Sequence, residues 1–245
     1  MAFNVESKIA LVTGANRGIG RAIVENLLAA GSKKVYLAVR NPASTSELES
    51  KYGERVKTLI VDMEDSQSIY ALAEQASDVE LLVNNAGRLE ISDPLSDNAA
   101  LALQKELTVN TFGLLHIAQA FNEILVQNHG ALVQMNSVAS MKNFLGVSTY
   151  SASKAASYAI TQGLREQWAE NGVQVLSVHP GPIATDMAAS AGMLEVAEPA
   201  DVVAKGIIDA LAAGQFHLFP DAIARQFEQQ YKSYAETIIE APASE

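Results

Sequence analysis

The sequence predicts an α/β fold built around a doubly wound parallel sheet with helices on both faces. Seven short, nearly continuous apolar runs recur along the 245-residue chain, and longer segments with helical patterning separate them. Such runs are typical of parallel strands that are covered on both faces. Helices between parallel strands imply right-handed crossovers onto one sheet. Because no linker or internal repeat divides the chain, we expect a single domain over residues 1–245.

The expected elements follow one another in a regular order. The first strand covers residues 8–12, and the next helix runs from 18 to 30 and ends at Gly31. The other six strands are expected at 35–39, 56–61, 81–83, 131–135, 173–178 and 216–219. Further helices are expected at 64–76 and, rich in Gln and Glu, at about 222–239. The last residues, 241–245, are expected to fray.

The composition excludes several classes of protein and site. The chain has no cysteine, so disulfides and thiolate metal sites are excluded, and no residues have metal-ligand spacing. A net charge of −11 argues against nucleic acid or an anionic membrane as a partner. No apolar run approaches the roughly 18 residues that span a bilayer. The start of the chain lacks the features of a secretory signal, and we expect a cytoplasmic protein.

A glycine-rich turn directly follows the first strand. Such a turn lets the backbone approach a pyrophosphate, which the N-terminus of the next helix then holds through free N–H groups. The sequence therefore predicts a Rossmann-type dinucleotide site, with the spacing Gly-x-x-x-Gly-x-Gly. Its candidate residues are Gly14, Asn16, Arg17, Gly18, Ile19 and Gly20.

The ends of the second and third strands indicate which dinucleotide binds. The second strand ends at Arg40 with no acid at its tip, and arginine there accommodates a 2′-phosphate. Arg17 is near enough in the sequence pattern to bind the same phosphate, so two guanidiniums favour NADP(H); two solvated surface arginines are the alternative. Asp62, followed by Met63, is either an acceptor for the adenine amino group or the N-cap of the helix at 64–76.

Tyr150 and Lys154 form the most informative pair in the chain. Their i,i+4 spacing places both side chains on one face of a helix. An ammonium favours the phenolate of a nearby tyrosine, and such a tyrosine can exchange a proton with a carbonyl or alcohol oxygen. Taken alone, the same spacing is more often found on a solvated surface.

Together these motifs resemble the short-chain dehydrogenases/reductases, in their compact single-domain, carbonyl-reductase-like form. The resemblance covers nearly the whole chain. It rests on motifs in the family's order: the glycine turn at 13–20, Asn-Asn-Ala-Gly at 84–87, Asn110, Ser137, Tyr150-x-x-x-Lys154 and Pro180-Gly181.

The resemblance implies a catalytic set of Asn110, Ser137, Tyr150 and Lys154. Tyr150 would be the general acid in reduction and the base in oxidation. Lys154 would lower the pKa of Tyr150 and bind the nicotinamide ribose, while Ser137 would donate to the substrate oxygen. Asn110 would hold a water through its backbone carbonyl at a kink in its helix. Each residue also has a structural interpretation when it is considered alone. Ser137 could be a turn residue at the end of a strand, and Asn110 could be a helix residue whose side chain bonds its own backbone.

The resemblance also implies the rest of the cofactor and substrate site. Asn84, Ala86 and Gly87 would line the adenosine ribose and pack the central sheet. The segment Pro180, Gly181, Ile183 and Thr185 would run beside the nicotinamide. The substrate would meet Ser137, Tyr150 and an apolar wall that offers no cation, which favours a neutral, fairly hydrophobic ketone or aldehyde. This wall comprises Ala139, Phe144, Met187 and Met193, the last two in a substrate-binding loop at about 184–198 that we expect to act as a mobile lid. His116 and His179 are interpreted as structural.

Two alternatives to this predicted function remain, and the first differs only in the substrate. A 3-ketoacyl-thioester reductase of the same family would normally end in a strand followed by an acid and two glycines, which this chain lacks. The other, from a different class, is a catalytically silent NADP-sensing regulator, which would not need the complete catalytic set. In either case the resemblance implies a homodimer or homotetramer, paired through the helices of Asn110 and Tyr150.

Overall fold

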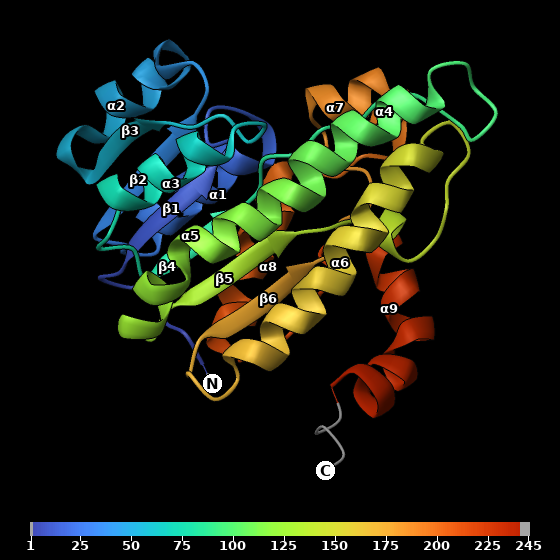
Figure 1. Cartoon of the computed structure of the whole chain (residues 1–245). Coiled ribbons are helices and arrows are strands. Elements are labelled where there is room, and N and C mark those ends of the chain that lie inside the picture. Colours follow the sequence, from blue (N-terminus) through green and yellow to red (C-terminus); the bar gives the residue numbers. More distant parts are fainter. Residues whose placement is uncertain (1, 241–245) are drawn as a thin grey trace.

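A seven-stranded parallel sheet forms the centre of the molecule (Figure 1). The computed structural model describes residues 2–240; residues 241–245, which were expected to fray, lie outside this range. The strands hydrogen-bond in the order β3-β2-β1-β4-β5-β6-β7, which confirms the predicted doubly wound sheet. Their bounds are β1 Ile9–Thr13, β2 Lys34–Val39, β3 Val56–Ile60, β4 Leu81–Asn84, β5 Ala131–Met135, β6 Gln174–Val178 and β7 His217–Leu218.

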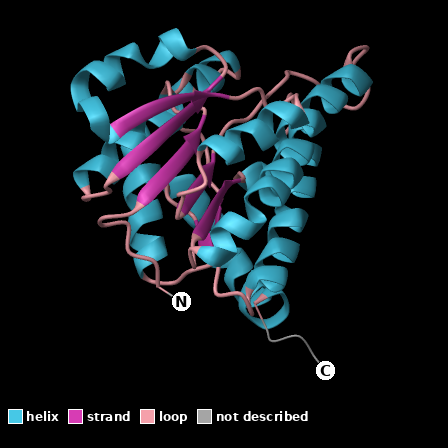
Figure 2. Ribbon diagram, turned by 60° about the vertical axis from the view of Figure 1, so that its left-hand side comes forward, coloured by secondary structure: helices cyan, strands magenta, loops and turns pink. Residues whose placement is uncertain are grey.

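Helices cover both faces of this sheet (Figure 2). Helices α1 and α8 pack on one face, and α3, α5 and α6 pack on the other. Strand β1 contributes to both layers, Ala10 and Val12 to the first and Leu11 to the second, because successive side chains of a strand point to opposite faces. The bounds are α1 Gly18–Ala29, α2 Ser46–Tyr52, α3 Ser66–Gln75, α4 Ala99–Glu106, α5 Gly113–Gln127, α6 Ser148–Trp168, α7 Asp186–Ser190, α8 Ala200–Ala212 and α9 Ala222–Tyr234.

The boundaries of two helices differ from the sequence-based expectation. Helix α3 begins at Ser66 because Asp65 is its N-cap; the Asp65 carboxylate accepts the N–H of Gln67 at 2.9 Å. The alternative in which Asp62 caps this helix is therefore wrong. The C-terminal helix expected at 222–239 consists of α9 and a π-helical turn, Ala235–Ile239.

A second π-helical turn, Leu107–Phe112, joins α4 to α5. Within it the N–H of Gly113 donates to the carbonyl of Thr108, five residues earlier. Such turns interrupt the regular ladder of a helix and occur frequently at functional sites. The helix that carries Asn110 is thus irregular at that residue, as expected.

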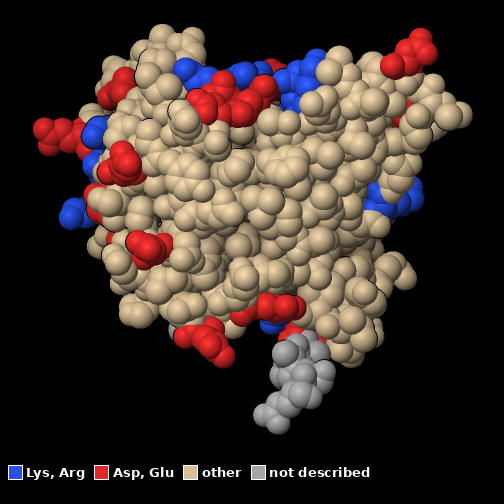
Figure 3. All heavy atoms as spheres, viewed as in Figure 1, with Lys and Arg blue, Asp and Glu red and all other residues tan. Residues whose placement is uncertain are grey.

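The surface is unevenly charged. Figure 3 shows charged side chains around the rim of this face, with Lys and Arg beside Asp and Glu along its upper edge, whereas the middle of the face, over α5 and α6, shows few. Within residues 2–240, no helix combines the length and the apolar character that crossing a membrane requires.

The hydroxyl of Thr13 ties the end of β1 to the end of β4. Thr13 is fully buried, and its Oγ1 accepts the N–H groups of Asn85 and Ala86, each at 2.9 Å. The same hydroxyl donates to Oδ1 of Asn84 at 3.2 Å. One side chain therefore satisfies two backbone donors of the segment that follows β4.

We expect Thr13→Val to lower the free energy of unfolding by roughly 2–4 kcal/mol, because it leaves two buried N–H groups without an acceptor. Thr13→Ser keeps the hydroxyl and loses only a methyl group, so its loss is expected to be about 1 kcal/mol. Urea unfolding of the two variants measures the difference. Equal stabilities of the two variants would show that the hydroxyl does not hold this segment.

Candidate active site

A deep cleft opens at the carboxyl ends of the strands, with a volume of about 1180 Å³. In open α/β sheets ligands bind at this edge. All of the residues predicted to bind a cofactor lie on its wall except Asn84. The residues predicted to contact substrate also line it: Ser137, Ala139, Phe144, Tyr150, Met187 and Met193.

The glycine turn brings backbone to the wall of the cleft, because its glycines carry no side chains. A Cβ atom on Gly20 would lie 2.7 Å from Nδ2 of Asn85, and nearer still to the carbonyl oxygen of Gly14. Helix α1 begins here with no side-chain cap and no acid in its first turn. Its first N–H groups are therefore available to an anion, which the positive end of the helix dipole also attracts.

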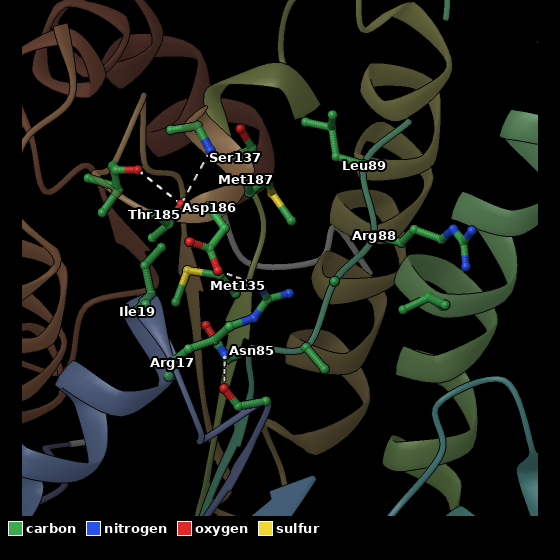
Figure 4. Close-up of a pocket in the computed structure, with 18 of the residues that line it drawn as sticks. Arg17, Ile19, Asn85, Arg88, Leu89, Met135, Ser137, Thr185, Asp186 and Met187 are labelled. Atoms are coloured by element: carbon green, nitrogen blue, oxygen red, sulfur yellow. Dashed lines mark hydrogen bonds and ion pairs between the residues drawn. The ribbon is translucent and has the colours of Figure 1, made fainter. Parts of the chain in front are cut away.

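Arg17 reaches from the glycine turn to Asp186, the first residue of α7, and forms an ion pair with it. Both side chains are largely exposed, at 70% and 76%, so the pair contributes little to stability. Figure 4 shows Arg17, Thr185, Asp186 and Met187 gathered on one side of the cleft, with Arg88 and Leu89 on the other. The pair connects the glycine turn to the predicted substrate loop.

Arg40 and Asp62 lie on the cleft wall at the ends of β2 and β3. Arg40 is exposed, and within residues 2–240 it has no ion-pair partner. Asp62 is half-buried; its carboxylate accepts the N–H of Glu64 and its own N–H donates to Ser68. The carboxylate therefore shapes the turn after β3 while it stays at the wall of the cleft.

Of the two neighbouring asparagines after β4, Asn85 and not Asn84 lines the cleft. Asn84 is 2% exposed and its Nδ2 donates to Oε1 of Gln134 on β5 at 2.8 Å. The side chain of Asn84 thus joins two strands inside the sheet. The prediction that it lines the adenosine ribose is not supported by this position.

Asn110 lies behind the cleft rather than on its wall. Its Oδ1 accepts the N–H of Arg88 at 2.8 Å, and its Nδ2 donates to the carbonyl of Arg88 and to Oγ of Ser153, each at 2.9 Å. A Cβ on Gly87 would lie 3.3 Å from Oδ1 of Asn110 and 3.7 Å from Nζ of Lys154. The segment that follows β4 therefore lies, at Gly87, directly against the side chains of Asn110 and Lys154.

Tyr150 and Ser137 both lie on the wall of the cleft. Tyr150 lies in the first turn of α6 and packs with Ala139 and Val147. Ser137 follows β5, where its Oγ accepts the N–H of Ala139 at 3.1 Å. A hydrogen bond from Ser137 favours the phenolate of Tyr150, but burial has the larger effect and raises the pKa of Tyr150. Both residues line the cleft, and they come from two different elements; the Ser137 hydroxyl donates to the carbonyl of Pro180 at 3.3 Å.

Lys154 is buried one turn further along α6. It is 3% exposed, and its Nζ donates to the carbonyl of Met135 at 2.8 Å. Burial lowers the pKa of Lys154 to about 8, so its ammonium is charged at neutral pH at an unfavourable cost in solvation.

Lys154 was expected to lower the pKa of Tyr150, but the net pKa of Tyr150 is raised in this structure. The pKa of Tyr150 is raised by burial and, less strongly, by the carboxylate of Glu106. The Lys154 ammonium lies 5.7 Å from the centre of the Tyr150 ring and is directed at the end of β5. Desolvation of the phenolate therefore outweighs attraction by this cation.

The sequence analysis missed several residues of the cleft wall. Arg88 is the most polar of them; it pairs with Glu64 at 3.1 Å and with Glu90 at 2.7 Å. The loop after β4 that carries these residues is held by Glu106, whose buried carboxylate accepts the N–H of Glu90 at 2.8 Å. Only the matching motif at 84–87 marked this part of the sequence. The other missed residues include Leu89, Val147 and Ile223.

His179 lies outside the cleft wall, among buried partners. It is fully buried, with Nε2 2.7 Å from Oγ of Ser177 and Nδ1 3.0 Å from Oγ of Ser140. Burial lowers the pKa of His179 to about 3, so the ring is neutral. These contacts agree with its interpretation as structural.

Comparison with known sequences gives a consistent result. The sequence profile of the family described as short chain dehydrogenase matches residues 8–194. An uncharacterised oxidoreductase of Staphylococcus saprophyticus is 31% identical over 214 residues, which cover 83% of this chain and 91% of that protein. The 3-oxoacyl-acyl-carrier-protein reductase of Haemophilus influenzae is 31% identical over 193 residues, which cover 75% of this chain and 77% of that protein.

Solved structures agree as well. A short-chain dehydrogenase of Burkholderia cenocepacia, in complex with NADP, has a TM-score of 0.86 and 30% identity; the match covers 98% of this chain and 100% of that one. A short-chain dehydrogenase/reductase of Burkholderia phymatum, in complex with NAD, has a TM-score of 0.81. Its identity is 23%, over 99% of this chain and 100% of that one, so this likeness shows the fold alone.

We expect Lys154→Met to stabilise the protein at neutral pH. Because the folded-state pKa of Lys154 is lowered to about 8, its protonation opposes folding below that pH, and the penalty vanishes as pH rises to the ordinary lysine value of about 10.4. After loss of the bond to Met135, a net gain of roughly 1–2 kcal/mol remains at pH 7, which raises the melting temperature by about 2–8 °C.

Thermal unfolding at neutral and alkaline pH measures this effect. The exposed Lys57→Met on β3 serves as the control and is expected to change nothing. A melting temperature of Lys154→Met equal to that of the wild type at pH 7 would contradict the unfavourable burial of this ammonium.

Proposed function

Because the chain belongs to the short-chain dehydrogenase/reductase family and is an oxidoreductase of it, we propose that it uses NADPH to reduce a neutral, fairly hydrophobic ketone or aldehyde to an alcohol, reversibly. The observation that carries the proposal is the convergence of Ser137, Tyr150 and Lys154 at one end of a cleft whose other end is a bare glycine turn. A sensing regulator has no need of the catalytic end, whereas a ketoacyl-thioester reductase would use both ends and differs only in its substrate.

The shape and charge of the cleft fit a dinucleotide. A turn in which Gly20 has no space for a Cβ lets a pyrophosphate lie against the backbone. The first N–H groups of α1 would hold that pyrophosphate, and Arg17 and Arg40 would hold a 2′-phosphate. Residues 180–185, which we call the β6 loop, would lie beside the nicotinamide. The binding of NADP by the Burkholderia cenocepacia relative supports this choice.

When bound, NADPH would supply the hydride for the carbonyl carbon. Tyr150 donates its phenolic proton to the carbonyl oxygen, and the Ser137 hydroxyl donates a hydrogen bond to the same oxygen as negative charge develops on it. The Lys154 ammonium, 5.7 Å from the centre of the Tyr150 ring, stabilises the phenolate that remains. Asn110 holds the segment above Lys154 through both backbone groups of Arg88.

The protonation state of Tyr150 suits reduction at neutral pH. Burial raises the pKa of Tyr150, so the phenol carries its proton below that value and can act as an acid. Oxidation of an alcohol requires the deprotonated phenol. The oxidative direction is therefore expected to accelerate as pH rises.

The far end of the cleft favours an uncharged substrate. Ala139, Phe144 and Val147 form an apolar wall around Tyr150, and Met193 also lines the cleft. Arg88 lies on the wall as well, but Glu64 and Glu90 already neutralise it. An anionic keto acid would thus enter an apolar site without an available cation, at a desolvation cost.

We expect Tyr150→Phe to lower kcat for ketone reduction by at least about 100-fold, because the proton donor is lost, while NADPH still binds. NADPH consumption with a panel of carbonyl compounds, and NADPH fluorescence on binding, measure the two effects. Tyr158→Phe, on the same helix but outside the cleft wall, is the matched control. Unchanged turnover in Tyr150→Phe would contradict the assigned role.

The same panel separates the alternatives. Preference for an anionic keto acid would contradict the neutral substrate class. Preference for an acetoacetyl thioester would favour the ketoacyl-thioester reductase, which the Haemophilus influenzae relative represents. NADPH binding without turnover of any carbonyl would favour the sensing regulator.

We expect Arg40→Asp to reverse the preference between the cofactors. The variant loses a charged hydrogen bond to the 2′-phosphate and places a carboxylate near it, which repels the phosphate. Loss of such a hydrogen bond costs roughly 1.5–3 kcal/mol. The kcat/KM for NADPH should therefore fall by about 10- to 100-fold, and kcat/KM for NADH should rise. Steady-state kinetics with both cofactors measure the change. Lys57→Asp, on β3 and outside the cleft, is the control; an unchanged preference in Arg40→Asp would remove Arg40 from the phosphate site.

A further inference from the structure

Asp221 joins the β6 loop to the start of α9. Its side chain is buried, with the residue 1% exposed. One carboxylate oxygen accepts the N–H of Gly181 at 2.7 Å, and the other accepts the N–H of Ala224, in the first turn of α9, at 2.9 Å. Within residues 2–240 no Lys or Arg forms an ion pair with Asp221, so backbone N–H groups and the positive end of α9 balance its charge.

Gly181 is shaped to receive this carboxylate. A Cβ atom at position 181 would lie 2.6 Å from Oδ1 of Asp221 and 3.2 Å from Cβ of Ile223. The backbone of the β6 loop therefore lies directly against the first turn of α9, with no space for a side chain between them. Both Gly181 and Ile223 line the cleft, so a shift of this contact moves the cleft wall.

Glu198 makes a second connection between the same two segments. Its backbone pairs with the β6 loop: the N–H of Glu198 donates to the carbonyl of Pro182 at 3.1 Å, and its carbonyl accepts the N–H of Ala184 at 2.8 Å. Its carboxylate accepts the N–H of Ala222, the first residue of α9, at 2.6 Å. The β6 loop and α9 are thus fastened to each other at two points.

A helix N-cap does not by itself require this arrangement. Asp65 caps α3 through the N–H of Gln67 while it remains exposed to solvent. Burial of an unpaired carboxylate is costly unless hydrogen bonds satisfy it. Asp221, unlike Asp65, is buried and also contacts the cleft wall through Gly181. The contact with Gly181 is therefore what the burial of this carboxylate adds to an ordinary helix cap.

We propose that Asp221 is a positioning residue for hydride transfer: through the N–H of Gly181 it fixes the β6 loop, and with it the place of the nicotinamide ring against Tyr150 and Ser137. This inference rests on the proposed function, because the β6 loop lies beside a nicotinamide only if NADPH binds as described. Asp221 touches neither the cofactor nor the substrate in this arrangement. It acts through Gly181 and through Ile223, which α9 carries.

Three variants of the full-length enzyme test the proposal: Asp221→Ala, Asp221→Asn and, as the control cap, Asp65→Ala. The measurements are kcat, the dissociation constant of NADPH by fluorescence, the isotope effect with NADPH deuterated at the transferred position, and the melting temperature. We expect Asp221→Ala to lower kcat about tenfold or more and to raise the isotope effect, because a misplaced ring slows the hydride step. Asp65→Ala should lower only the melting temperature.

Asp221→Asn keeps one acceptor oxygen, so its kcat is expected to lie between those of the wild type and Asp221→Ala. The proposal is overturned if Asp221→Ala shares the kcat, isotope effect and NADPH affinity of Asp65→Ala. If Asp221→Ala does not fold, Asp221→Asn takes its place in the comparison with Asp65→Ala. The proposal is then overturned if these two variants share the same kcat, isotope effect and NADPH affinity.

The result also separates this proposal from the proposed function. If the wild type reduces no carbonyl compound yet binds NADPH, the proposed function fails. The positioning role is then judged by NADPH affinity, which Asp221→Ala should weaken about tenfold. If the wild type does not bind NADPH, both proposals are wrong.

Discussion

The burial of Lys154 is the constraint around which the rest of the site is arranged. An ammonium that is 3% exposed needs a fixed acceptor, and the carbonyl of Met135 at the end of β5 provides it at 2.8 Å. This bond fixes α6 on the sheet and thereby fixes Tyr150, one turn earlier on the same helix. Low solvent exposure also strengthens every electrostatic interaction of these two side chains. The unfavourable pKa shift of Lys154 is therefore a direct consequence of the same burial that makes its charge effective.

Regular secondary structure alone does not position Asn110 and the segment after β4, which lie against Lys154. The π-helical turn at Leu107–Phe112 interrupts the ladder between α4 and α5 and presents Asn110 to the segment after β4. Thr13 binds the beginning of that segment, and Asn110 and Glu106 bind it further along. Buried side chains thus replace the backbone hydrogen bonds that a loop cannot make for itself. A loop held in this way is rigid enough to form one wall of a cleft.

Much of the fold and of the candidate site could be predicted from the sequence, because both depend on local patterns. Apolar runs mark the seven strands, and parallel strands bring their carboxyl ends to one edge, so the glycine turn, Arg40 and Ser137 necessarily meet there. The direction of the pKa shift of Tyr150 and the distance of the Asn84 side chain from the cleft could not be predicted. Each depends on burial or on a partner distant in sequence, and neither has a local signature.

The distribution of charge follows from the same long-range contacts and divides the cleft into two chemically different halves. Arg88 stands near the apolar half, where Glu64 and Glu90 neutralise it. Arg40 stands at the other half, next to the unblocked first turn of α1, and has no carboxylate partner within residues 2–240. Although the whole chain carries a net charge of −11, Arg40 and the uncapped first turn of α1 thus offer positive charge to a ligand at this end of the cleft. An anionic ligand group is attracted to that end, and the uncharged part of the same ligand is left to lie toward Tyr150.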